Sequence, residues 1–265
     1  MAPIHGPQVV AIARARRHAR GMADEVAVLR LEGGKANAMT PTLLASLERM
    51  VDGFERGPAA VAVLTGYDRY FSGGLALPDI IDLDPVQMRG FIEYFSRVMT
   101  RVFACEKPIV AAINGHAIAG GYVLALMCDW RISVDDPRAR LGLNEAQLGI
   151  GLPAIVVQPL RAAVPAASLV PVALEGTLFA PAEAAALGLV DELVPAADLI
   201  ARATAKATAL AALPPAGVAQ VKHALRAPIL DLIARTADAD TTRWLETWFS
   251  PRAQERLRAA VARLR

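Results

Sequence analysis

Cysteine is scarce in this chain. Cys105 and Cys128 are the two cysteines among 265 residues, and they lie far apart without the paired spacing of a zinc site. Two cysteines also do not make a disulfide framework, so the sequence predicts a reducing compartment, which we take to be the cytoplasm. We expect neither a metal ion nor a redox cofactor.

Long hydrophobic runs and an excess of one charge are also missing. The apolar stretches at residues 59–64 and 109–113 are much shorter than the roughly 18 residues that cross a bilayer. The 28 basic and 26 acidic residues leave a net charge of only +2. So balanced a charge does not indicate nucleic acid or a membrane surface as a partner, and we expect neither.

The first 21 residues contain four arginines and no acid. This composition suits a transit peptide, and a start at Met22 is a further alternative. We prefer a third interpretation, in which Val9–Ile12 forms a strand that pairs as a hairpin with residues 25–29.

Aromatic residues make up 5% of the chain and hydrophobic residues 54%, so small aliphatic side chains must fill the core. Strand-like segments alternate with helical ones, which favours an α/β domain with mostly parallel strands. We expect strands at residues 26–31, 60–65, 108–113 and 130–134, and helices at 41–56, 84–104 and 120–127. The helix after Thr40 has Pro41 at its first position, and Asp84-Pro85 opens the next.

The pattern changes near Pro195, after which the chain is helical in composition. We expect breaks in this tail at Pro214-Pro215 and at Pro228, and a restart at Ser250-Pro251. The predicted division is therefore a core of residues 1–197 followed by a helical region of residues 198–265.

Two glycine-rich turns each follow an apolar segment. They are FSGGLAL at residues 71–77 and AINGHAIAGGYVLALMCD at residues 112–129. A Gly-Gly pair is often only a tight turn. Two such turns also present bare amide groups, and the N–H groups of Leu75 and Gly120 are suited to hold one oxyanion. On this interpretation an anionic oxygen, rather than a side chain, occupies the space at Gly73 and Gly74.

A lone carboxylate stands in GLNEAQLGIGLP, residues 142–153. Asn144 is placed to cap a short helix that has Glu145 in its first turn. Glu145 is then either a solvated acid favoured by the helix dipole, or a carboxylate in an apolar pocket whose raised pKa makes it a proton shuttle. The sequence leaves both open.

Other polar residues are weaker candidates. Ser72 has neither a nearby histidine nor a nucleophile-elbow motif, and His116 is expected to be a loop residue rather than a base. Tyr122 is expected to pack, and Asp191 to serve as a turn or interface acid.

Four segments in this order resemble the enoyl-CoA hydratase/isomerase (crotonase) superfamily: FSGGLAL, INGHAIAGGYVLALMCDWRI, LGLNEAQLGI and FAPAEAAALGLVDELVP. The resemblance implies a spiral of ββα units, a helical C-terminal region that forms trimers or dimers of trimers, and an acyl-CoA thioester as substrate. Its carbonyl oxygen would lie between the amides of Leu75 and Gly120. The remaining substrate-binding residues implied are Lys35, Ala36, Gly73, Gly74, Ala76, Leu77 and Gly121.

Two departures bear on the reaction. The superfamily's hydratases resemble one another in carrying two glutamates, of which only Glu145 is present, because the first position is Val123. Adding water requires two groups, whereas one carboxylate is enough to move a double bond from carbon 3 to carbon 2. The pattern thus favours a Δ3,Δ2-enoyl-CoA isomerase. The second departure is Ala76, where the family usually has an acid.

Two alternatives remain. One is another acyl-CoA activity on the same scaffold, namely hydration, hydrolysis or decarboxylation. The other is a non-catalytic member that binds acyl-CoA or RNA. An RNA-binding helix rich in lysine would mark the latter, and Met39–Arg56 offers only Arg49 and Arg56 as basic residues.

Overall fold

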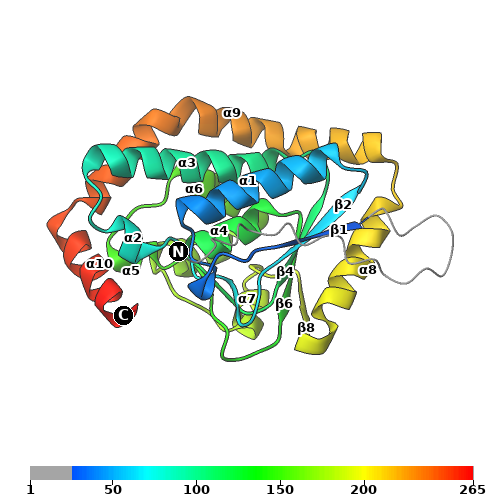
Figure 1. Ribbon diagram of the computed structural model, residues 1–265, viewed down its shortest axis with the longest axis horizontal. Helices are drawn as coiled ribbons and strands as arrows, with labels where there is room; N and C mark the ends of the chain where they lie inside the picture. The colour runs from blue at the N-terminus through cyan, green and yellow to red at the C-terminus, as the bar shows by residue number, and fades with distance from the viewer. Residues whose placement is uncertain (1–25, 265) are drawn as a thin grey trace, which may run out of the picture.

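The computed structural model describes residues 26–264, and it places their strands in two parallel sheets (Figure 1). The large sheet has the order β1-β2-β4-β6-β8 and the small sheet the order β3-β5-β7. The strands are β1 (Val26–Arg30), β2 (Val61–Thr65), β3 (Tyr70–Ser72), β4 (Ile109–Ile113), β5 (His116–Ile118), β6 (Trp130–Val134), β7 (Leu141–Gly142) and β8 (Glu192–Val194). The strand expected at Val9–Ile12 lies outside the described residues.

The helices fill the intervals and form the C-terminal part (Figure 1). They are α1 (Pro41–Arg56), α2 (Leu77–Ile80), α3 (Pro85–Ala104), α4 (Gly120–Met127), α5 (Glu145–Leu148), α6 (Ala154–Ala163), α7 (Pro181–Ala186), α8 (Leu199–Ala211), α9 (Pro215–Trp248) and α10 (Pro251–Leu264). Within residues 26–264, none of them is both long enough and apolar enough to cross a membrane.

The chain repeats one unit three times. In β2-β3-α2, β4-β5-α4 and β6-β7-α5, the first strand joins the large sheet, the second joins the small sheet, and a helix follows. This is the spiral of ββα units expected for the crotonase fold. Because the pairs β3·β5 and β5·β7 are both parallel, the carboxyl ends of three strands from three units meet at one edge of the small sheet.

Local capping signals fix where two of the long helices begin. Thr40 Oγ1 accepts a hydrogen bond from Leu43 N at 3.1 Å, with Pro41 at the first position of α1. Asp84 Oδ1 accepts from Val86 N and Gln87 N at 2.9 Å, and Gln87 Oε1 in turn accepts from Asp84 N. Both predicted starts are confirmed, because a cap needs only the residues next to it.

The hydrophobic core lies on both faces of the large sheet. Along β2, Ala62 and Leu64 join the main cluster, while Val61 and Val63 join a smaller cluster that α8 covers. This explains why the strand reads as a continuous apolar run instead of an alternating one. The expectation of a strand covered on both faces is confirmed.

The C-terminal helices show one prediction that was wrong. Pro228 does not break the chain, because α9 runs continuously from Pro215 to Trp248. A proline inside a helix removes one backbone hydrogen bond at a typical expense of about 3 kcal/mol. Packing of α9 along α3 and α6 offsets that loss. Ion pairs from Lys222 and Arg226 to Asp129 hold the helical turns of α9 that precede Pro228. The breaks at Pro214-Pro215 and Ser250-Pro251 are confirmed.

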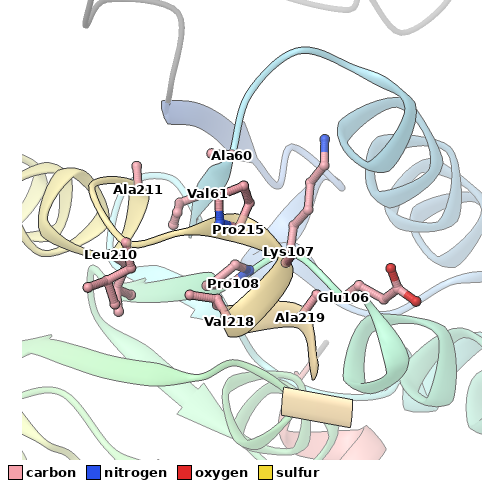
Figure 2. Close-up of a pocket in the computed structure, with 12 residues that line it drawn as sticks. Ala60, Val61, Glu106, Lys107, Pro108, Leu210, Ala211, Pro215, Val218 and Ala219 are labelled. Carbon is pink, nitrogen blue, oxygen red and sulfur yellow. The ribbon is translucent and has the colours of Figure 1, made fainter. Parts of the chain in front are cut away.

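A hollow of about 280 Å³ lies where the turn between α8 and α9 passes the amino ends of β2 and β4 (Figure 2). Its walls are mostly apolar and include Val61, Pro108, Leu210 and Val218. None of the predicted site residues lines it. The division of the chain at residue 198 stays a prediction.

Candidate active site

The three predicted motifs meet at the carboxyl edge of the small sheet. Strand β3 ends at Ser72 and leads into the first glycine loop, and β5 ends at Ile118 and leads into the second. Strand β7 ends at Gly142, three residues before Glu145. Ile118 is in register with Gly142, and the N–H of Ala119 donates to Gly142 O at 2.8 Å. Residues more than 70 positions apart therefore share one edge.

Gly74 and Gly121 lack side chains for a reason that differs from the one expected at Gly73 and Gly74. A Cβ on Gly74 would lie 2.7 Å from Ile118 O, and a Cβ on Gly121 would lie 2.1 Å from Ser72 O. Gly74 also has φ of +88°, a conformation that favours glycine. The space beside these glycines is filled by the backbone of the neighbouring loop, so the absence of side chains lets the two loops touch.

The two predicted amide donors lie in these touching loops. Met39 N donates to Gly74 O at 2.8 Å and Ala76 N donates to Met39 O at 3.4 Å, so the Leu75 N–H between them faces away from Met39. Gly120 is the first residue of α4, where an amide has no partner within its own helix. Within the part of the chain that the structure describes, neither N–H donates a hydrogen bond.

The second loop holds an unusual backbone conformation just before its donor. Ala119 has φ of 51° and ψ of −122°, a region that residues with a Cβ rarely adopt. Conformations of this kind typically carry about 1–3 kcal/mol of strain and gather at functional sites. Here the strained residue precedes Gly120 and sets the direction of its N–H.

Glu145 is buried, which decides between its two interpretations. The residue is 9% exposed, and its Oε2 has no hydrogen-bond partner within the described chain. Burial raises the pKa of its carboxyl to about 7, and the backbone N–H groups of Glu145 and Asn144 offset part of the rise. A carboxyl with a pKa near 7 is able both to take up and to release a proton at neutral pH.

Asn144 precedes α5 but does not cap it. Its side chain makes no capping hydrogen bond, since its ψ of 16° departs from the extended conformation that a capping residue adopts. Its Oδ1 is buried and has no partner among residues 26–264. The capping prediction was wrong.

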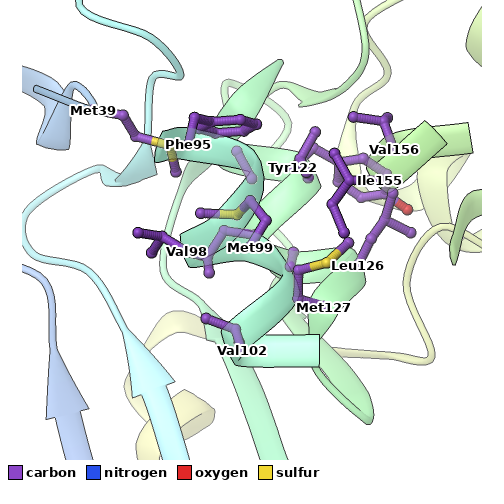
Figure 3. Close-up of a cluster of buried hydrophobic side chains, with 14 of the residues drawn as sticks. Met39, Phe95, Val98, Met99, Val102, Tyr122, Leu126, Met127, Ile155 and Val156 are labelled. Carbon is purple, nitrogen blue, oxygen red and sulfur yellow. The ribbon is translucent and has the colours of Figure 1, made fainter. Parts of the chain in front are cut away.

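Apolar side chains surround the second loop. A Cβ on Gly120 would lie 3.3–3.5 Å from Met39 Sδ, Phe95 Cε2 and Leu75 Cδ2. Val123, at the position of the hydratases' first glutamate, is 1% exposed. Figure 3 shows Met39 and Phe95 within the buried cluster to which Tyr122 and Met99 also belong. The surroundings of Gly120 are thus apolar.

The remaining predicted substrate-binding residues lie around the first loop. Ala76 is buried, and Leu77 begins α2. Lys35 and Ala36 belong to the 3-10 turn Lys35–Asn37, and the Ala36 carbonyl accepts from Gly73 N at 2.8 Å. Lys35 Nζ donates to Leu264 O of α10 at 3.0 Å.

Sequence reasoning missed two residues that organise the site, Asn37 and Met39. Asn37 is fully buried, and Met39 contacts both glycine loops. Asn37 lies within the segment of residues 35–38 whose backbone the resemblance implies in CoA binding, but its side chain was given no role.

The weaker candidates have other roles. Ser72 Oγ donates to Asn37 O at 2.8 Å, and Tyr122 Oη donates to Leu189 O at 2.9 Å. His116 starts β5, at the end of the strand away from Gly120, and burial lowers its pKa. Asp191 pairs with Arg131. Among residues 26–264, no group of three or more His, Cys, Asp or Glu side chains is placed to hold a metal ion.

Comparison with known proteins places this geometry in a family. Residues 21–259 match the enoyl-CoA hydratase/isomerase family. The human mitochondrial enoyl-CoA delta isomerase 1 is 30% identical over 248 residues, which cover 91% of this chain and 80% of that protein. A putative enoyl-CoA hydratase of Thermus thermophilus is 36% identical over 200 residues, covering 73% and 77%.

Solved structures agree with the sequence matches. The crystal structure of human mitochondrial Δ3-Δ2-enoyl-CoA isomerase superposes with a TM-score of 0.87 at 28% identity, covering 92% of this chain and 95% of the other. The fold, the order of the motifs and the family match all indicate the same family. The chain is an enzyme of the enoyl-CoA hydratase/isomerase family, within the crotonase superfamily.

Proposed function

We propose that the enzyme moves the double bond of 3-enoyl-CoA thioesters to the 2-position. The observation that carries this proposal is the buried carboxylate of Glu145, close after the edge where the three strands end. Residues 73–77 and 119–123 contain no acid, and Glu145 follows the third strand. Double-bond migration needs one group that removes a proton and returns it, which one carboxylate does alone.

In the proposed mechanism, the thioester oxygen accepts hydrogen bonds from the N–H groups of Leu75 and Gly120. Ionised Glu145 removes a proton from carbon 2, and the negative charge moves onto the thioester oxygen as a dienolate. Protonated Glu145 then returns the proton to carbon 4. Each N–H is worth about 3 kcal/mol to a transition state that develops this charge, because the donors are already oriented and the surroundings exclude water.

Hydration fits the site less well. It requires one group to position and deprotonate the water and another to manage the proton at the adjacent carbon. The second group would have to stand at residue 123, where a buried valine offers no proton and no hydrogen bond to water.

Incubation of the purified enzyme with 3-enoyl-CoA and with 2-enoyl-CoA, in separate assays, tests the proposal. An isomerase converts the first and hardly hydrates the second. Glu145→Gln should lose isomerisation while it keeps acyl-CoA affinity, because glutamine has the same shape but no exchangeable acidic proton. Rapid hydration of 2-enoyl-CoA, hydrolysis, decarboxylation or unchanged turnover of the glutamine variant would refute the assignment.

We also propose that the enzyme works without a metal or redox cofactor, in the cytoplasm, as a homotrimer or a dimer of trimers. Val221 and Leu225 are both exposed and lie one turn apart on the same face of α9, and this supports assembly because neighbouring exposed apolar side chains mark interaction surfaces. Light scattering after size-exclusion chromatography measures the assembly. A monomer would contradict it.

A further inference from the structure

The first glycine loop carries Leu75, but its own side chains offer little to hold it. Residues 73 and 74 are glycines, and residue 76 is an alanine. An oxyanion donor is effective only when its direction is fixed before the reaction begins. The loop must therefore be fixed by another segment.

That segment is residues 36–39, which runs beside the loop. Gly73 N donates to Ala36 O at 2.8 Å, and Met39 N donates to Gly74 O at 2.8 Å. Between these two contacts, Ser72 Oγ donates to Asn37 O at 2.8 Å and accepts from Gly74 N at 3.2 Å. The loop is therefore held at Gly73 N and at Gly74 O, and the Gly74 carbonyl belongs to the same peptide group as the Leu75 N–H.

The backbone of residues 36 and 37 has an unfavourable conformation that other contacts must stabilise. Ala36 and Asn37 have φ of 59° and 48°, two consecutive residues in the left-handed region that side chains disfavour. The Asn37 side chain supplies the support. Its Oδ1 accepts from Gly33 N at 2.7 Å, and its Nδ2 donates to Leu31 O at 3.0 Å and to Phe71 O at 3.2 Å.

We propose that Asn37 is a positioning residue for the oxyanion site: its side chain ties the 36–39 segment to the ends of β1 and β3 and, through Ser72, sets the direction of the Leu75 N–H. Asn37 does not touch the reacting atoms. This inference rests on the proposed function in that it assumes a thioester oxygen at Leu75.

The chain offers a matched control. Asn114 braces the turn before β3 in the same manner, with Oδ1 accepting from Gly66 N at 2.9 Å and Nδ2 donating to Asp68 O at 3.1 Å. Asn114 Nδ2 also donates to Tyr70 O at 3.2 Å, at the amino end of β3, whereas the shortest bond from Asn37 Nδ2 to this strand goes to Phe71 O at 3.2 Å. Asn37→Gly keeps the left-handed backbone accessible while it removes the side-chain hydrogen bonds. Asn114→Gly removes equivalent bonds at the amino end of β3 and leaves the 36–39 segment and Ser72 in place.

Two measurements test the role, both at a temperature well below unfolding of every variant. With 3-enoyl-CoA as substrate, Asn37→Gly should lower kcat by about 10–100-fold, with a smaller change in KM, because a misdirected donor acts mainly on the transition state. Asn114→Gly should keep the wild-type kcat. Ser72→Ala, which cuts the link while leaving Asn37 in place, should lower kcat in the same direction and serves if Asn37→Gly does not fold.

The second measurement does not depend on turnover. Hexanoyl-CoA labelled with ¹³C at its thioester carbonyl has no double bond to move, and its infrared carbonyl stretch falls in frequency when N–H donors polarise it. We expect a clear fall on the wild-type protein and on Asn114→Gly, and a smaller one on Asn37→Gly and Ser72→Ala.

The outcomes separate the two proposals. Wild-type kcat and a full frequency fall in Asn37→Gly and Ser72→Ala would overturn the positioning role and leave the isomerase assignment intact. Equal losses in Asn114→Gly would also overturn it, since the effect would then be general. A wild-type protein that lowers the frequency but does not isomerise 3-enoyl-CoA would remove the proposed function, while the frequency shifts of the variants would still support the role of Asn37.

Discussion

Replacement of Glu145 by glutamine should make the folded protein more stable at high pH. Burial raises the pKa of this carboxyl from an ordinary 4.5 to about 7, so the folded protein binds the proton more tightly than the unfolded chain does. The stabilisation from the protonated form is fully present below about pH 4.5 and is lost as the pH rises through about 7. Above pH 7 the folded enzyme holds a buried negative charge.

The difference of about 2.5 pKa units corresponds to about 3 kcal/mol. Glutamine resembles the protonated acid at every pH. Glu145→Gln should therefore raise the free energy of unfolding by about 3 kcal/mol at pH 8.5 and by less than about 1 kcal/mol at pH 5.

Urea unfolding at both pH values, at one fixed protein concentration, measures this difference. Glu106→Gln, at an exposed position, serves as the control and should show the same change at both pH values. A Glu145→Gln variant whose stability relative to wild type does not depend on pH would refute the burial of an ionisable group in an apolar site. The same pKa predicts that kcat/KM falls as the pH drops below about 7, because the base must be ionised.

Three further predictions concern single sites. Val123→Glu should raise hydration of 2-enoyl-CoA at least about tenfold in a product assay, because it supplies a second proton-transfer group; no gain would show that the geometry of a hydratase is absent. Ala119→Gly should raise the free energy of unfolding by about 1 kcal/mol, measured by urea denaturation, since glycine adopts a positive φ without strain. An unchanged or lowered free energy of unfolding would contradict this prediction. Asp129→Asn should lower that free energy by about 3 kcal/mol because Lys222 and Arg226 lose their shared counter-ion, and a loss below about 1 kcal/mol would contradict this reason.

The motifs of the candidate site could be found in the sequence because they are local. A Gly-Gly pair after an apolar strand and an acid among apolar neighbours are visible within a few residues. The reason why these positions are glycines was not visible in the sequence. A side chain on Gly74 would clash with Ile118 O and one on Gly121 with Ser72 O, and in each case the clashing carbonyl comes from a distant segment of the chain. The role of Asn37 was equally hidden, because its side chain bonds to Phe71 on β3, 34 residues away.

Among the elements, those with strong local signals were predicted and the others were not. The start of the helix after Thr40 was predicted from its capping residue and from the proline at its first position. The strands of the small sheet are only two or three residues long, too short to show any periodicity, so β3, β5 and β7 did not appear in the prediction. Pro228 misled for the opposite reason, because a strong local signal was overridden by the packing of α9 on α3.

By itself the sequence determined the helix starts, the apolar strands and the presence of Val123 where the superfamily's hydratases have a glutamate, since these depend on the identity of residues and on neighbours within a few positions. Only the tertiary structure decided that three loops share one edge and that Glu145 is buried with a pKa near 7. The physical reason is that desolvation and hydrogen-bond direction depend on atoms brought together from distant parts of the chain.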